Sequence, residues 1–260
     1  MLVAQLVHAV ERLAPAVLAE EWDNVGLLVG RHNQPVRRVL VALELRGEVL
    51  AEAREHGCDA VVTHHPPIFP SIAALTDGGR AAELVLRAAE DRVAIVAAHT
   101  NLDSARGGLN DLMAGILGVA DARPLRPSAD DPGAGLGRVG GVGAATLAEL
   151  VQRVRGGFPG APVRYVGDPW ARVERVACCT GSGGSLIDDA RAAGADAYVT
   201  SDLKYHDADR AEGLPLVHLP HAHAERVTLK AWTKGLARAL APEGVEVRFA
   251  DTDTDPWQAA

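Results

Sequence analysis

Three short segments of the chain carry residues of the kinds that bind divalent metal ions. In the first, VVTHHPPIF, His64 and His65 follow an apolar run and precede two prolines. Because neighbouring side chains of an extended chain point to opposite sides, adjacent histidines often bind two different ions. A histidine pair alone could equally belong to a polar loop, so its interpretation depends on the other two segments.

The second and third segments each supply a carboxylate. In AAHTNLDS, Asp103 lies four residues after His99 at the end of another apolar run. In HLPHAHAER, His221 and Glu225 are four residues apart, so on a helix they would share one face and could bind one ion together. Either carboxylate could instead serve the backbone, in a turn or in the first turn of a helix. The three segments together favour a metal site with imidazole and carboxylate ligands.

Two further segments are polar enough to contribute to a pocket. CCTGSGGSL contains a Gly-rich turn at 180–184 whose backbone N–H groups could bind an anion, but it lacks the lysine of a Walker motif. A tight turn followed by a helix that Ser185 caps is the simpler interpretation. TSDLKYHDADRAEG places Lys204 and His206 after another apolar run, where they either line a pocket or merely connect two elements.

An alternation of strands and helices positions the first two clusters. Short apolar runs predict buried strands, and apolar residues three or four positions apart predict helices. Helices are expected at 1–19, 48–56, 80–91 and 108–117, and strands at 39–43, 60–63 and 93–97. The histidine pair and the segment from His99 to Asp103 thus each follow a strand. In open α/β sheets ligands collect at this edge, because loops and helix N-termini meet there.

A second α/β region follows the stretch 121–143, which is rich in Gly, Pro and Asp and has no hydrophobic periodicity. We interpret that stretch as a linker. Strands are expected at 163–166, 173–179, 197–200, 216–219 and 245–249, and helices at 147–155, 186–193 and 224–240. We therefore predict a first lobe of residues 1–125, which carries the first two clusters and is joined by the C-terminal segment 228–260. Residues 126–227 form the second lobe in this prediction.

Composition and charge limit the classes of function. The chain of 260 residues has a formal net charge of −8, which argues against a nucleic acid as its main partner. No apolar run reaches the roughly 18 residues of a membrane span, and charged residues interrupt the N-terminal segment. We therefore expect a cytoplasmic protein without a membrane partner. The three cysteines are expected to be buried thiols rather than a disulfide framework.

In their order and spacing, five motifs resemble those of the Nif-three-like family, also known as GTP cyclohydrolase 1 type 2. They are EWDNVGLLVG, THHPPIF, HTNLDSARGGLND, SDLKYHDA and HAHAER, and the resemblance covers nearly the whole chain. It implies an α/β fold of two related lobes with a dinuclear metal centre between them. It also implies a toroidal homohexamer whose sites face an internal cavity.

Matched motif by motif, the metal ligands of the family fall on residues of the three segments described first. These are His64, His65, Asp103, His221 and Glu225. Other pocket residues of the family fall on Asp23, Asn24, His99, Lys204 and His206. The chain departs from the family's pattern at Glu44, Ser201 and Pro220, and none of these departures removes a ligand.

Two functions fit these residues. In the first, two divalent ions per chain serve a metal-dependent hydrolase of small phosphorylated or nucleotide-like substrates, and His99, Lys204 or His206 protonates a leaving group or binds a phosphate. In the second, a hexameric scaffold binds metal for storage, delivery or regulation without turnover. Histidine, aspartate and glutamate suit Zn, Mn, Fe or Ni, so the ligands do not select one metal. The sequence shows no pocket for a guanine base that would support the cyclohydrolase name.

Overall fold

The structure of the protein is a computed structural model that describes residues 1–257. The chain divides into two units, and each has its own β-sheet. Residues 1–102 and 229–256 form the first unit, and residues 103–228 with Trp257 form the second. This mixed α/β architecture with two sheets agrees with the fold class expected from the sequence.

The boundary between the units lies earlier in the chain than the sequence suggested. Helix α5 (Leu109–Ile116), which was expected in the first lobe, contributes Met113 and Ala114 to the core of the second unit. Asp103 also belongs to the second unit, so the histidine pair and this carboxylate come from different units.

In the described part of the first unit, five strands form a sheet in the order β1-β4-β3-β2-β11. Their bounds are Gly26–Val29 for β1, Arg38–Ala42 for β2, Ala60–Thr63 for β3, Ala94–Ala97 for β4 and Glu246–Phe249 for β11. β1 runs antiparallel to β4 at one edge, and the other strands are parallel. Every residue of β3 and β4 is buried, as parallel strands covered on both faces require.

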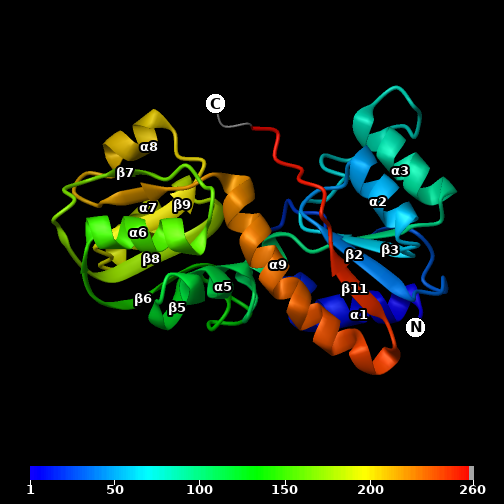
Figure 1. Ribbon diagram of the computed structural model, residues 1–260, viewed down its shortest axis with the longest axis horizontal. Helices are drawn as coiled ribbons and strands as arrows, with labels where there is room; N and C mark the ends of the chain where they lie inside the picture. The colour runs from blue at the N-terminus through cyan, green and yellow to red at the C-terminus, as the bar shows by residue number, and fades with distance from the viewer. Residues whose placement is uncertain (258–260) are drawn as a thin grey trace. The chain divides into compact units, whose positions relative to one another are not determined.

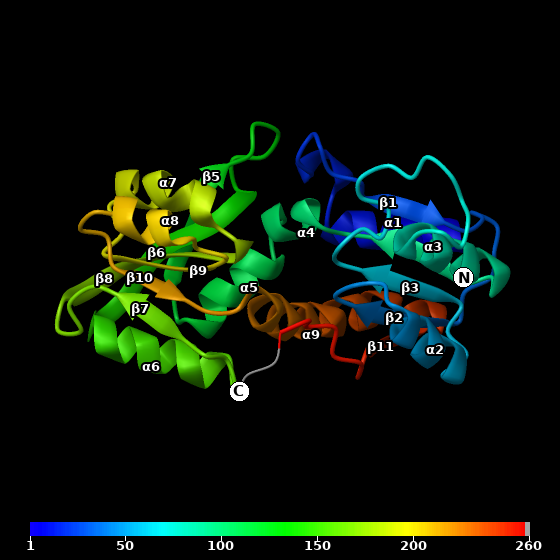
Figure 2. The same ribbon diagram turned by 90° about the horizontal axis from the view of Figure 1, so that it is seen from above.

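Helices cover both faces of this sheet. In Figures 1 and 2, α2 (Gly47–Glu55) and α3 (Arg80–Glu90) lie over one face. α1 (Val3–Leu13) lies over the other face, together with the later turns of α9 (His221–Leu240). The apolar residues of α2, such as Leu50, lie on the side of the helix that enters the core.

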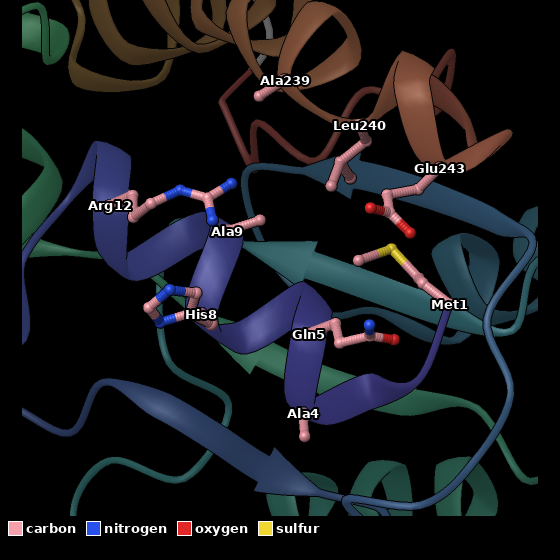
Figure 3. A pocket seen from close by; sticks show the side chains of 9 residues that line it. All are labelled: Met1, Ala4, Gln5, His8, Ala9, Arg12, Ala239, Leu240 and Glu243. Atoms are coloured by element: carbon pink, nitrogen blue, oxygen red, sulfur yellow. The ribbon is translucent and has the colours of Figure 1, made fainter.

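A pocket of about 340 Å³ lies between α1 and the end of α9 (Figure 3). Its lining includes Arg12 from α1, and Leu240 and Glu243 from the end of α9 and the turn that follows. None of the metal ligands predicted from the sequence is among the described residues that line it. This pocket is therefore not the site that the sequence predicts.

The second unit contains, within its described residues, a sheet of six strands in the order β5-β6-β8-β9-β10-β7. Their bounds are Ala120–Pro127 for β5, Gly135–Thr146 for β6, Arg164–Val166 for β7, Arg172–Ser182 for β8, Ala197–Ser201 for β9 and Leu216–His218 for β10. β8, β9 and β10 are parallel, whereas β5, β6 and β7 each run antiparallel to their neighbours.

Alternate residues of β8 enter two different cores. Cys178 packs on the side of α5 and α6 (Leu147–Gly157), and Cys179 packs on the side of α7 (Ile187–Ala192). Both are buried free thiols, as is Cys58, which confirms the expectation from the sequence. The sheet of the second unit is therefore covered on both faces.

The stretch 121–143 is not a linker, because strands β5 and β6 occupy most of it as an antiparallel pair. β5 lies at the edge of the sheet, where residues such as Pro124 are tolerated because one side of the strand needs no ladder hydrogen bonds. At Gly140 a Cβ would lie 2.3 Å from the carbonyl oxygen of Ala120, so the close approach of the strands requires glycine. The composition that suggested a linker therefore reflects an edge strand and tight strand packing.

Besides β5 and β6, the short elements without a predicted counterpart include α4 (Thr100–Ser104), the five-residue helix that carries Asp103, and the two described next. β1 is a four-residue edge strand of mostly intermediate burial, and α8 (Tyr205–Arg210) is a polar helix of six residues without a buried residue. Neither shows the periodic apolar pattern that reveals an element in a sequence. None of the described helices combines the length and the apolar character that crossing a membrane requires.

A buried arginine ties α5 to the sheet of the second unit. Arg138 on β6 is 1% exposed, and its guanidinium pairs with the carboxylate of Asp111 on α5. It also donates to the carbonyl oxygens of Gly135 and Gly137, both at 2.7 Å, and to that of Ala105 at 3.1 Å. This network fixes the start of α5, which follows the segment with the candidate carboxylate, against the sheet.

Replacing Arg138 by leucine should lower the free energy of unfolding by about 3 to 5 kcal/mol, because Asp111 and several carbonyl groups would lose their donors. Arg172 on β8 offers a matched control, since its side chain is 75% exposed and pairs with Glu174 at the surface. Arg172→Leu should change the stability by less than about 1 kcal/mol. Urea unfolding of the two variants tests this, and equal stabilities would contradict a structural role for the Arg138 network.

Candidate metal site

Three histidines gather at the carboxyl end of the first sheet. His64 and His65 follow β3, and His99 follows the neighbouring parallel strand β4. Each offers a ring nitrogen, and these nitrogens lie within 4.8 Å of one another. His64 is fully buried, and the other two are partly exposed. Three nitrogens at this spacing can surround a metal ion at the border between core and solvent.

Two of these histidines are oriented through Nδ1 by the core of the first unit. Nδ1 of His64 lies 2.9 Å from the carbonyl oxygen of Ala98, and Nδ1 of His99 lies 2.8 Å from Oδ1 of Asp23. Although burial opposes its ionisation, hydrogen bonds from His99 and Thr100 lower the pKa of Asp23 to about 2. A neutral imidazole that donates from Nδ1 carries its lone pair on Nε2, which is how metal-binding histidines are usually held.

The third histidine has a carboxylate partner of the same kind. Nδ1 of His65 faces Oε1 of Glu44 at 3.4 Å, and Arg46 pairs with the other oxygen of Glu44 at 2.8 Å. The hydrogen bond with His65 outweighs burial and, with the help of Arg46, lowers the pKa of Glu44 to about 2. Glu44 is therefore ionised at neutral pH and adds negative charge beside the histidines.

The second unit contributes a histidine and a glutamate from the first turns of α9. The helix begins at His221, so His221 and Glu225 share one face as predicted, with Nε2 of the histidine 2.8 Å from Oε1 of the glutamate. Nδ1 of His221 lies 2.7 Å from Oδ2 of Asp202, which directly follows β9. Glu225 is only 3% exposed. The two side chains therefore form a close pair of possible ligands.

Asp202 and Glu225 place negative charge on both sides of the His221 ring. Burial acts to lower the pKa of His221, but the hydrogen bonds and charges of these two carboxylates prevail and raise it to about 10. The hydrogen bond with His221 in turn lowers the pKa of Asp202. Without a metal ion the ring is therefore protonated at neutral pH, and a metal ion that binds Nε2 must displace that proton.

Asp103 is held within the second unit by residues of α5 and β8. It is 9% exposed, and the Thr180 hydroxyl lies 3.3 Å from its Oδ1. The side-chain amide of Asn110 donates to the backbone carbonyl of Asp103 at 3.0 Å, and its Oδ1 accepts from the backbone N–H of Thr180 at 2.9 Å. Asn110, which had no chemical role in the sequence analysis, therefore supports the candidate carboxylate.

The Gly-rich segment leaves space beside Glu225. Gly181 has a φ of +64°, and a Cβ at this position would lie 2.3 Å from Oε1 of Glu225 and 3.4 Å from Nε2 of His221. The expected Ser185 cap does not form, because β8 continues to Ser182 and a 3-10 turn at Gly184–Leu186 leads into α7, which has no side-chain cap. Glycine is thus required where the backbone of β8 faces the candidate ligands.

Of the three candidate catalytic residues, only His99 lies with a group of possible metal ligands. Lys204 and His206 lie at the start of α8, and both are exposed. The backbone N–H of Lys204 donates to Oδ2 of Asp207 at 3.0 Å, and the His206 ring contacts the Tyr205 ring at a centroid distance of 5.3 Å. Neither belongs to a metal-binding group among the described residues.

Two carboxylates of the site had no assigned role in the sequence analysis. Glu44 orients His65, and Asp202 orients His221. Each follows a buried strand within two residues, which is the same signal that drew attention to the histidines. Their partners could not be inferred, because each pairing joins segments that are adjacent in space but separated in the chain.

Comparison with known proteins gives a consistent assignment. The family model of Duf34/NIF3 (NGG1p interacting factor 3) matches residues 1–256. A protein from Streptomyces coelicolor named GTP cyclohydrolase 1 type 2 homolog is 38% identical over 98% of this chain and 93% of its own length. NIF3-like protein 1 of Drosophila melanogaster is 29% identical over 97% of this chain and 87% of its own length.

Solved structures with the same fold cover nearly the whole chain. A hypothetical protein of Staphylococcus aureus is 27% identical with a TM-score of 0.93, covering 100% of this chain and 99% of its own. HcgD from Methanocaldococcus jannaschii, in its reduced form, is 29% identical with a TM-score of 0.80, covering 97% of this chain and 98% of its own. Because the sequence motifs, the fold and the family match all agree, the chain belongs to the Duf34/NIF3 family.

Proposed function

We propose that the protein is a metal-dependent hydrolase of small phosphorylated or nucleotide-like substrates with two divalent ions per chain. The proposed metal ligands are His64, His65, Asp103, His221 and Glu225. The observation that carries the proposal is the orientation of the histidines among them, each of which directs Nδ1 towards a carbonyl or carboxylate oxygen. This arrangement leaves Nε2 to bind a metal ion and is characteristic of histidine ligands.

The proposed ligands include both nitrogen and oxygen donors. The first unit offers imidazoles, and the second offers one imidazole together with the carboxylates of Asp103 and Glu225. Mixed nitrogen and oxygen donors suit Zn, Mn, Fe or Ni. We therefore propose that the five ligands together would hold two ions, with Asp103 or Glu225 shared between them.

Residues around the proposed ligands would handle the substrate. When bound, two such ions polarise a phosphoryl oxygen and lower the pKa of a water molecule towards neutrality. His99 is oriented by Asp23 and would donate a proton to the leaving group. Lys204 supplies an exposed positive charge for a phosphate, and His206 is a second possible proton donor.

The names of the relatives do not define the reaction. GTP cyclohydrolase 1 type 2 homolog is the name of similar proteins, and one fold supports many chemistries. The alternative is a metal-binding scaffold for storage, delivery or regulation, which would use the same ligands without turnover. The family resemblance also supports a toroidal homohexamer, and a closed symmetric assembly is the usual form of a homo-oligomer.

Asp103→Ala should separate the two functions. In protein loaded with Zn, Mn, Fe or Ni, the variant should lose at least about 100-fold in kcat/KM towards phosphate monoesters. The reason is that loss of a metal ligand should cost at least as much activity as loss of a residue that orients a metal ligand. Asp188→Ala is the matched control, since this aspartate is 71% exposed and pairs with Arg191 at the surface. If the wild type binds metal but hydrolyses these substrates no faster than Asp103→Ala does, the result would favour the scaffold.

Gly181→Ala should lower metal content, because the added Cβ would displace the carboxylate of Glu225. Gly194→Ala controls for backbone strain, since Gly194 also has a positive φ, +69°, and a Cβ there would meet no described atom within 4 Å. The two variants should lose similar stability, about 1 to 2 kcal/mol, whereas only the first should lose metal by elemental analysis. Equal metal contents would show that the space beside Glu225 is not needed for the ions.

Loss of the bridging ligand should release more metal than loss of a terminal one. We expect about two ions per wild-type chain, close to none in Glu225→Ala and about one in His221→Ala, because Glu225 is the better candidate for the shared carboxylate and would then hold both ions. Elemental analysis after gentle desalting measures these ratios. Retention of both ions in Glu225→Ala, or a wild-type ratio that stays near one under metal excess, would contradict the shared centre.

A further inference from the structure

A groove of about 380 Å³ lies in the second unit, at the edge of its sheet. Residues of β7, β10 and α8 line it, among them Arg164, Tyr165, Lys204, Tyr205 and His218. The volume falls in the range of small-molecule sites. β7 is the outermost strand of this sheet, so the groove opens beside an edge that no other described strand covers.

The charged groups of the groove are basic. Arg164 and Lys204 both line it, and no described lining residue is acidic. Nη2 of Arg164 lies 3.4 Å from Nδ1 of His218. Burial, together with the charge of Arg164, lowers the pKa of His218, so that ring is neutral at pH 7. Although the chain has a net charge of −8, the two positive charges of the groove make it locally complementary to a small anion.

Two tyrosines in the same groove are unusually exposed. Tyr165 is 45% exposed and Tyr205 is 80% exposed, while apolar side chains such as Leu216 contribute to the lining. Aromatic rings stack on nucleotide bases, and basic side chains bind phosphate. The groove therefore combines the two kinds of group that recognise a nucleotide.

The groove adjoins the segments that carry the proposed ligands of the second unit. Lys204 follows Asp202 by two residues, and His218 precedes His221 by three. β9 and β10 are parallel neighbours, so both segments leave the sheet at the same edge. The side of the groove that carries Lys204 is thus close in the chain to the pair formed by Asp202 and His221.

We propose that this groove binds a nucleoside monophosphate, with the base against Tyr165 and Tyr205 and the phosphate at Arg164 and Lys204. The proposal gives a substrate class to the hydrolase proposed above, and it rests on that function only for the claim that the bound nucleotide is a substrate. Binding itself requires only the groove.

Calorimetric titration of the full-length protein with three ligands tests the proposal. AMP carries both a base and a phosphate, adenosine carries only the base, and ribose 5-phosphate carries only the phosphate. After chelation of metal, AMP should bind at least about tenfold more tightly than either partial ligand, because stacking and phosphate contacts combine. The methylene phosphonate analogue of AMP, which cannot be hydrolysed, should bind metal-loaded protein with a similar affinity.

Two variants and two matched controls assign the binding to the groove. Tyr205→Ala should weaken AMP binding about tenfold and bring the affinity for AMP close to that for ribose 5-phosphate. Arg164→Gln should instead bring the affinity for AMP close to that for adenosine. Trp170→Ala and Arg172→Gln are the matched controls, because Trp170 is 78% exposed, the Arg172 side chain is 75% exposed, and neither lines the groove. Both controls should leave AMP binding unchanged.

Several results would overturn the proposal. One is an AMP affinity that does not exceed that of ribose 5-phosphate, and another is that the groove variants bind AMP as their controls do. Binding that requires metal and ignores both groove variants would place the ligand on the ions instead. If no ligand binds and Tyr205→Ala lowers the mass measured by light scattering, the groove is an interface between copies of this chain. Because binding is measured without turnover, its outcome is independent of the Asp103→Ala test of hydrolysis.

Discussion

The candidate ligands depend on where the parallel strands of each sheet end. In the first unit β3 and β4 are neighbours, so the residues that follow them, His64, His65 and His99, emerge side by side. In the second unit β9 and β10 deliver Asp202 and the segment before His221 to one edge in the same way. A shift of one residue in a strand would turn side chains to the opposite face, so burial of the strands also sets the positions of the ligands.

The cost of burying charge explains why the candidate ligands occur in hydrogen-bonded pairs. Asp23 and Glu44 stay ionised because histidine partners hold their pKa values at about 2. In the metal-free protein the protonated ring of His221 balances Glu225, which is 3% exposed. Since the pKa of His221 rises from 6.5 to about 10, this pairing contributes fully to stability below pH 6.5, and the contribution is lost as the pH rises through about 10.

Local properties of the sequence were sufficient for much of the fold. Strand 60–63 is an uninterrupted apolar run, and the spacing of His221 and Glu225 is helical, so both were predicted and both are observed. The linker predicted at 121–143 was wrong, because Gly and Pro are common to loops and to tightly packed edge strands. The pairing of Glu44 with His65 and of Asp202 with His221 could not be assigned from the sequence, because each pair joins segments that are separated in the chain. Asp103 was placed in the wrong unit for a similar reason, since α5 packs on a sheet whose strands come later in the chain.

The central proposal is that His64, His65, Asp103, His221 and Glu225 together bind two divalent ions, and anomalous diffraction from crystals of the metal-loaded protein tests it. The account predicts two anomalous peaks per chain about 3.5 to 4 Å apart. One should be bound through Nε2 of the histidine pair and the other through Nε2 of His221, with a carboxylate of Asp103 or Glu225 shared between them. A single peak per chain, two distant peaks that share no ligand, or ligation through Nδ1 would contradict it.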